Sequence, residues 1–147
     1  MPIASFRVSI KINASPDKVF AYISDLTRHG EWAADPLQIA ALTPGQISMG
    51  SRYRSTAQSH GITFNTELEV TEYSAPSRFA FVGEDATGKF SHVFTFQTHQ
   101  GGTLLTRRIN FTASFFQWLV FWVLLYPARI PSARRTLELL KARLEHS

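Results

Sequence analysis

The stretch from Ser114 to Leu144 constrains the fold most, because it joins a strongly apolar run to a one-sided helical pattern. Residues Phe115–Tyr126 are apolar around the whole helical wheel, which is typical of a helix that is buried or in contact with lipid. In the second half, apolar residues recur at alternating three- and four-residue spacing: Ile130, Ala133, Leu137, Leu140 and Leu144. This pattern predicts a long C-terminal helix with one face on an apolar surface.

The same region raises the question of a membrane. No charged residue lies between Arg108 and Arg129, which is about the length that a membrane-spanning helix needs. Polar residues interrupt this window, and its dense apolar part covers only about a dozen residues, a length more typical of buried helices. A buried helix or a peripheral membrane contact is therefore favoured over a span. The five Arg or Lys and two Glu after Tyr126 fit either an anionic membrane surface or an ordinary solvated helix face.

Composition narrows the class of protein. With 147 residues, 44% hydrophobic and 18% charged, the chain is expected to form a single domain over residues 1–147. It contains no Cys, which excludes disulfides and thiolate metal sites. The N-terminus lacks a basic region followed by an apolar run, so a cytoplasmic location is expected. No dinucleotide, phosphate-loop, metal or nucleic-acid motif is present, so we expect no cofactor, no metal and no nucleic acid.

The N-terminal third predicts one strand and two short helices. Apolar and polar residues alternate over Phe6–Ile12, as in a half-buried strand. Ser15 and Pro16 then form a helix start, with the Ser as cap and the Pro at the first helical position. We interpret Leu26–Gly30 as a break, and Gly30–Trp32 as the start of a second short helical piece that ends before Pro36.

From there the apolar pattern has period two. Six further strands are expected, with the fifth and sixth joined by a turn at Gln100–Gly101; they cover residues 37–42, 52–59, 63–73, 78–83, 90–96 and 105–111. Short connections between consecutive strands imply an antiparallel sheet of about seven strands, whose apolar face needs a cover. Only the C-terminal helix is long enough to be that cover. The expected fold class is α+β, with a curved sheet wrapped around the helix and a ligand cavity between them.

Several segments together resemble the START/Bet v 1-like (SRPBCC) superfamily, and within it the polyketide cyclase/dehydrase and lipid-transport group. They are Ile12–Phe20, Trp32, Glu69–Arg78 and Gly102–Thr106, in addition to the order of elements. The resemblance implies the helix-grip fold and an internal cavity. It implies no single activity, because the superfamily includes carriers of lipids, sterols and hormones as well as aromatic polyketide cyclases.

The predicted inward face of the sheet is mostly hydrocarbon, but it contains Thr66, His92 and Arg107. If the hairpin turns at Gln100–Gly101, Phe94 pairs with Arg107, and His92 becomes a diagonal neighbour within reach of the Arg side chain. A buried guanidinium needs a polar or acidic partner. Arg107 and His92 are therefore expected to bind the acidic head of an apolar ligand. The alternative is that Arg107 lies near the end of the sheet and extends to solvent, with His92 as an ordinary core residue.

The candidate ligand-binding residues are Trp32, Tyr53, Thr66, His92, Phe94, Arg107, Ile109, Trp118 and Trp122. Trp32 either closes the cavity mouth or anchors the core, and Trp118 and Trp122 either fill the interior or form an apolar entrance, a dimer contact or a membrane contact. The other four His are expected in loops or at the terminus, and the acids nearest to Trp32 are expected to be solvated. No residue is assigned as catalytic.

Three functional hypotheses follow. The first is a non-enzymatic carrier for a small hydrophobic or lipid-like molecule with an acidic group. The second is an enzyme of cyclase or dehydratase type, in which His92 moves a proton. The third is a membrane-associated protein, or a homodimer, that uses Phe115–Tyr126 as its contact surface.

Overall fold

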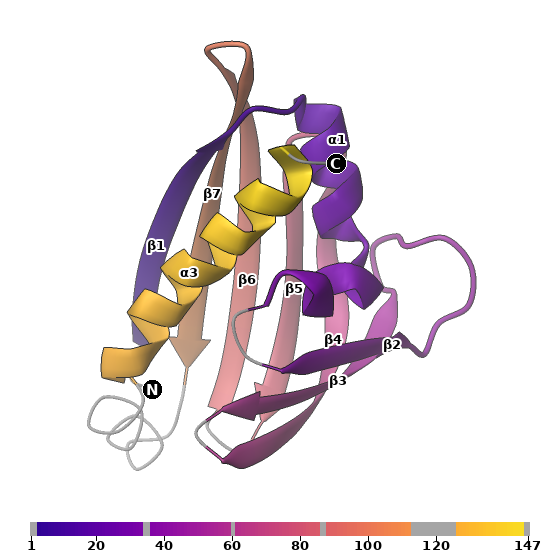
Figure 1. Ribbon diagram of the computed structural model, residues 1–147. Helices are drawn as coiled ribbons and strands as arrows, with labels where there is room; N and C mark the ends of the chain where they lie inside the picture. Colours follow the sequence, from indigo (N-terminus) through magenta and orange to yellow (C-terminus); the bar gives the residue numbers. More distant parts are fainter. Residues whose placement is uncertain (1–2, 34–35, 60, 86–87, 113–125, 146–147) are drawn as a thin grey trace.

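The computed structural model describes residues 3–33, 36–59, 61–85, 88–112 and 126–145. These residues form a seven-stranded antiparallel sheet in the order β1-β7-β6-β5-β4-β3-β2, with one long helix against one of its faces (Figure 1). The strands are β1 (Ile3–Ile12), β2 (Leu37–Ala41), β3 (Arg52–Ser59), β4 (Ile62–Ser74), β5 (Arg78–Asp85), β6 (Gly88–His99) and β7 (Gly102–Thr112). The helices are α1 (Pro16–Ser24), the 3₁₀ helix η1 (Leu26–Glu31) and α3 (Tyr126–Glu145). This α+β helix-grip arrangement confirms the predicted fold class.

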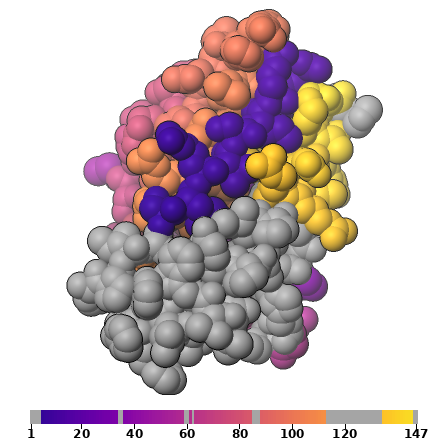
Figure 2. All heavy atoms as spheres, turned by 90° about the vertical axis from the view of Figure 1, so that its left-hand side faces the viewer, coloured from indigo at the N-terminus to yellow at the C-terminus, as the bar shows by residue number. Residues whose placement is uncertain are grey.

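The C-terminal helix packs through the part of the predicted apolar stripe whose side chains the structure describes, and Ile130 and Ala133 lie outside that part. Leu137, Leu140 and Leu144 are buried, whereas Arg134 and Glu138 are exposed. Figure 2 shows α3 lying beside the edge strand β1 at the surface. Lys141 Nζ donates to the carbonyl oxygen of Lys11 at 2.8 Å, which fixes this end of the helix to β1. The sequence predicts a helix from Ser114, and the described helix begins at Tyr126; residues 113–125, including Trp118 and Trp122, lie outside the described residues.

Helix α1 begins as predicted. The Ser15 hydroxyl accepts from the Lys18 N–H at 3.3 Å, and Pro16 occupies the first helical position, where its missing N–H costs nothing. The helix buries Val19, Phe20 and Ile23 against the sheet. Its apolar stripe therefore covers the end of the sheet next to the C-terminal end of α3, where Lys18 Nζ donates to the Leu144 carbonyl oxygen at 3.2 Å (Figure 1).

The second helical piece was predicted in the wrong place. The expected break at Leu26–Gly30 is itself helical, as η1 spans Leu26–Glu31 and Trp32 is its C-terminal cap. A 3₁₀ helix places residues three apart on the same side. Leu26, His29 and Trp32 follow this spacing, and all three are buried. The prediction that His29 lies in a loop is therefore also wrong.

The hairpin of β6 and β7 has the predicted register. Phe94 pairs with Arg107, Phe96 with Leu105 and His92 with Ile109. Gln100 and Gly101 both have positive φ, as a tight two-residue hairpin turn requires. The inward face of β6 and β7 therefore carries His92 and Arg107 on diagonal positions, among Phe94, Phe96 and Leu105.

Among the described residues, no helix combines the length and the apolar character that crossing a membrane requires.

Candidate functional site

The candidate site is centred on Arg107, which lies in the middle of β7 and faces the interior of the sheet. Its Nε donates to His92 Nδ1 at 3.2 Å, and its Nη2 lies 2.8 Å from the same nitrogen. Because a guanidinium can only donate, Nδ1 of His92 must be the acceptor and carries no proton. The mid-strand position argues against the alternative in which Arg107 leaves the interior at the end of the sheet.

Aromatic rings surround this pair. The Arg107 Cζ lies 5.4 Å from the centroid of Phe94 and 5.9 Å from that of Trp32, both within cation–π range. The His92 ring stacks on Phe81, with centroids 4.9 Å apart and an interplanar angle of 6°. Burial among these groups lowers the pKa of Arg107 to about 10. The guanidinium is still protonated at neutral pH, so the interior contains a fixed positive charge.

Among the described residues, Arg107 forms no ion pair with a carboxylate. His92 uses the Nε and Nη2 side of the guanidinium, which leaves the opposite edge formed by Nη1 and Nη2. Two parallel N–H groups on such an edge match the two oxygens of a carboxylate. The arrangement is therefore chemically suited to a planar oxyanion.

Trp32 and His29 form the wall opposite the sheet. Trp32 is 2% exposed, and its Nε1–H has no hydrogen-bond acceptor among the described residues. Its ring lies over that of His29, with centroids 4.6 Å apart. The His29 Nε2 lies 2.7 Å from the Ile23 carbonyl oxygen and so carries the ring proton. Burial lowers the pKa of His29 to about 4, and nearby Arg107 acts in the same direction, so His29 is neutral at neutral pH.

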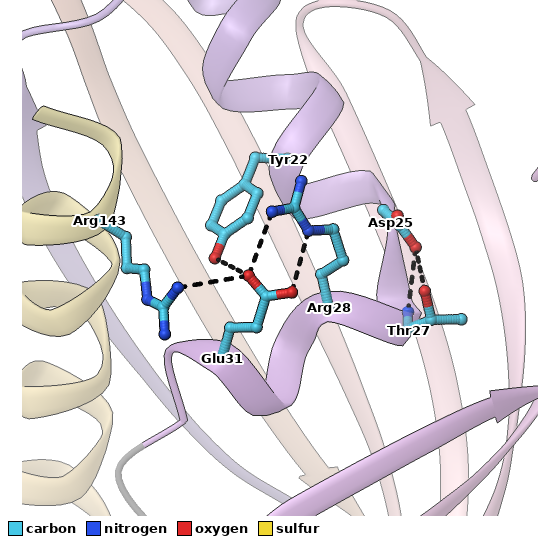
Figure 3. A network of polar contacts seen from close by, with 6 residues as sticks. All are labelled: Tyr22, Asp25, Thr27, Arg28, Glu31 and Arg143. Atoms are coloured by element: carbon cyan, nitrogen blue, oxygen red, sulfur yellow. Dashed lines mark hydrogen bonds and ion pairs between the residues drawn. The ribbon is translucent and has the colours of Figure 1, made fainter. Parts of the chain in front are cut away.

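An ionic network on the outside fixes the segment that carries Trp32 and His29 (Figure 3). The Glu31 carboxylate accepts from Tyr22 Oη at 3.0 Å and from Arg28 Nε at 3.1 Å, and it lies 3.6 Å from Arg143 Nη1. Arg28 and Tyr22 lower the pKa of Glu31 by hydrogen bonding, so the carboxylate is ionised. The network joins α1, η1 and α3, which gives Glu31 a structural role.

Asp25 has a different structural role. Its carboxylate caps η1, accepting from the backbone N–H of Thr27 at 3.2 Å and from its hydroxyl at 2.6 Å. Asp25 and Glu31 therefore stabilise the wall of the site rather than contribute a carboxylate to its interior.

The structure brings together five of the nine predicted site residues: Trp32, His92, Phe94, Arg107 and Ile109. Two others lie apart from Arg107. Thr66 is buried on β4. The β4 residue that lies across the sheet from His92 is Val70, four residues further along the strand, so Thr66 is distant from the His92–Arg107 pair. Tyr53 is on β3, three strands away from β6, and burial and Asp25 raise its pKa. Sequence reasoning missed His29 and Phe81; the three-residue spacing of Leu26, His29 and Trp32 was the available signal for His29.

A groove of about 480 Å³ lies on the opposite face of the sheet. Most of its lining side chains point outward from β4 to β7, including Glu67, Glu84, Lys89 and Asn110. Glu67 is paired there with Arg52 at 2.7 Å. The groove is lined mostly by polar and charged residues and does not include Arg107, so it is not the interior cavity that the sequence predicts.

The architecture, a seven-stranded antiparallel sheet with a long C-terminal helix against one face, is the helix-grip fold of START/Bet v 1-like proteins. Solved structures of this fold are similar to the chain over nearly its whole length. TTHA0849 from Thermus thermophilus superposes with a TM-score of 0.76 at 17% identity, covering 96% of this chain and 97% of the other. Ara h 8.0201 gives a TM-score of 0.73 at 12% identity, covering 99% and 100%. At these identities the likeness shows the fold alone.

The family is shown by a separate comparison. Residues 4–145 match the family described as polyketide cyclase / dehydrase and lipid transport, and the chain belongs to that family. A curated relative, the uncharacterized protein Rv1546 of Mycobacterium tuberculosis, is 25% identical over 109 residues, which cover 74% of this chain and 76% of the relative.

Proposed function

We propose that the protein binds a small, mostly hydrophobic molecule between the sheet and α3, with an acidic head on Arg107. The observation that carries this proposal is the state of Arg107, a partly buried guanidinium whose hydrogen-bond partner is the neutral nitrogen of His92. A cation in such surroundings is costly unless an anion meets it. Membership of the polyketide cyclase / dehydrase and lipid-transport family supports a small-molecule ligand.

The burial pattern supports a direction for the apolar part of the ligand. Phe20, Phe79 and Phe96 form a closed aromatic cluster under α1, with Phe20 centroid distances of 6.4 Å to Phe79 and 5.2 Å to Phe96. Along β6 and β7 away from α1, Phe90 and Ile109 belong to the inward rows but are only partly buried. The ligand tail accordingly extends from Arg107 toward Phe90 and Ile109.

The geometry favours binding over a cyclase or dehydratase reaction. Nδ1 of His92 already accepts from Arg107, so that nitrogen is not available as a base while the contact persists. Among the described residues, the acids next to this region, Asp25 and Glu31, are engaged in a helix cap and in an ionic network. The membrane and dimer hypotheses depend on residues 115–126, almost all of which lie outside the described residues.

Two head-group pairs test the proposal: decanoate against decanol, and 2-naphthoate against 2-naphthalenemethanol, titrated calorimetrically into the wild-type protein. We expect at least one acid to bind more tightly than its alcohol. Arg107→Gln should weaken the binding of that acid about 10- to 100-fold and leave the alcohol nearly unchanged. Arg108→Gln is the matched control, because Arg108 is the next residue on β7 and is exposed on the other face.

Native mass spectrometry of protein purified without denaturation complements the titrations, because a co-purified ligand reports its own mass. An acid that binds equally well to wild type and to Arg107→Gln would contradict the role of Arg107. The absence of binding in both pairs, together with the absence of a co-purified small molecule, would contradict the proposed function itself.

A further inference from the structure

The indole N–H of Trp32 is a buried donor without an acceptor in the described part of the chain. It has no hydrogen-bond partner among the described residues, and the Trp32 side chain is almost completely enclosed. Buried Trp N–H groups in folded proteins usually have a partner, so an orphan of this kind needs an explanation. The position of Trp32 beside Arg107 provides one.

The indole and the guanidinium are close enough to contact one small head group. The Trp32 ring centroid lies 5.9 Å from Arg107 Cζ. The side of the guanidinium formed by Nε and Nη2 is occupied by His92, which leaves its Nη1 edge as the second donor group. The guanidinium and the indole ring therefore border the same part of the interior.

Trp32 is also held in a fixed orientation. Its backbone N–H donates to the His29 carbonyl oxygen at 3.2 Å, and its ring packs on the His29 ring. His29 is in turn fixed by its 2.7 Å hydrogen bond to the Ile23 carbonyl oxygen. An indole supported in this way is pre-organised, which reduces the entropy that a ligand must offset when it accepts a hydrogen bond.

We propose that the Nε1–H of Trp32 is the second donor to the ligand head, so that Trp32 and Arg107 together select an oxyanion with two acceptor oxygens, such as a carboxylate. A neutral alcohol offers one oxygen and cannot use both donor groups equally well. The inference rests on the proposed function, and it adds a specificity-determining residue and a head-group class to it.

The direct test is a ¹H–¹⁵N spectrum of the indole groups of the wild-type protein, titrated with decanoate and with decanol. The chain contains three Trp, and the Trp32 signal is identified as the one that Trp32→Phe removes. Decanoate should move the Trp32 indole proton downfield, as an N–H does when it gains an acceptor. A Trp32 signal that stays in place while decanoate binds in an Arg107-dependent manner would overturn the inference and leave the proposed function intact.

A matched replacement tests the same N–H without changing the shape of the side chain. β-(3-Benzothienyl)alanine at position 32 keeps the bicyclic ring and replaces the N–H with sulfur. We expect decanoate to bind about tenfold more weakly and decanol to bind almost as before. Equal loss for both probes would indicate an effect of packing and would contradict the inference.

The stability of the ligand-free protein is a third readout, independent of any probe. If the N–H has no partner before the ligand binds, its replacement by sulfur should leave the urea unfolding midpoint unchanged or raise it. A clear fall in the midpoint would show that the N–H already has a partner within the protein, and the inference would be wrong. If decanoate does not bind, or if its binding does not depend on Arg107, the failure lies in the proposed function, and the inference falls with it.

Discussion

Replacement of Arg107 by methionine should leave the stability of the ligand-free protein almost unchanged. Methionine has a similar length and no charge, so Arg107→Met removes the guanidinium without leaving a large cavity. An Arg that holds the fold together would behave differently, because breaking a buried charge pair usually costs about 3–5 kcal/mol. The two interpretations of Arg107, ligand binding and structural support, therefore predict different free energies of unfolding.

The expected change follows from the environment of the side chain. Burial lowers the pKa of Arg107 from its ordinary value to about 10, which corresponds to a desolvation cost of roughly 3 kcal/mol. Solvent still reaches part of the side chain, which reduces this figure to about 1–3 kcal/mol. Because the folded-state pKa is the lower one, the cost is present in full below about pH 10 and fades as the pH rises above that value.

The interactions that the variant loses contribute a free energy similar to this desolvation cost. The hydrogen bond to His92 contributes about 1.5 kcal/mol, and each cation–π contact, with Trp32 and Phe94, about 0.5–1 kcal/mol. Relief of desolvation and loss of contacts nearly cancel. We therefore expect the free energy of unfolding of Arg107→Met to lie within about 1 kcal/mol of the wild-type value.

The measurement is urea unfolding at neutral pH, monitored by far-ultraviolet circular dichroism. The free energies of unfolding are compared between variants whose unfolding has the same dependence on urea concentration. Arg108→Met is the control for the loss of one Arg from the same strand, and its effect should stay within about 0.5 kcal/mol. A loss of more than about 2 kcal/mol in Arg107→Met, with Arg108→Met unchanged, would refute the reasoning and assign Arg107 to structural support.

Two further predictions concern the wall of the site and the covering helix. His29 has a folded-state pKa of about 4 against 6.5 when unfolded, so the unfolded chain binds the extra proton first as the pH falls. The free energy of unfolding of the wild-type protein should therefore fall by roughly 3 kcal/mol between pH 6.5 and pH 4 because of His29, and the His29→Gln variant should not show this fall. Urea titrations at several pH values measure it, and an equal fall in the wild type and in the variant would contradict the prediction. Leu140→Ala should lower the free energy of unfolding by about 2–5 kcal/mol, because Leu140 is fully buried. Its neighbour Leu139 is 39% exposed, so Leu139→Ala should lower it by less than about 1 kcal/mol. Similar losses in the two variants, measured by thermal unfolding, would mean that α3 packs in a different register.

The register of the β6–β7 hairpin was predictable because two local signals determine it. Period-two alternation decides which residues face inward, and a two-residue turn at Gln100 and Gly101 decides which residues are paired. Given both, the diagonal contact of His92 with Arg107 follows from sheet geometry. The same reasoning predicted the stripe of α3 and the start of α1, where spacing and a capping residue are again local signals.

The η1 segment was missed because its glycine has a non-local role. We interpreted Gly30 as a break between helices, whereas a Cβ at this position would collide with the carbonyl oxygen of Leu37. The glycine is needed because β2 passes close to η1, and not because the helix ends there. A contact between segments that are separated in the sequence leaves no periodic pattern, so the role of Gly30 could not be predicted, and the assumed break at this glycine concealed the three-residue spacing that includes His29.

The surroundings of Arg107 illustrate a further limit of sequence reasoning. The alternation in β7 predicts that a cation faces the interior. The indole beside it comes from the end of η1, so the groups that contact the guanidinium are determined only by the three-dimensional fold. In the fold, the closed aromatic cluster under α1 supplies packing, whereas the region of Trp32 and Arg107 retains an indole donor with no acceptor among the described residues. Aromatic packing and the proposed polar recognition are thus centred on neighbouring parts of one inward face, which meet where Phe79 pairs with Phe94. This arrangement is consistent with a sheet rich in Phe that tolerates a partly buried guanidinium in the middle of β7.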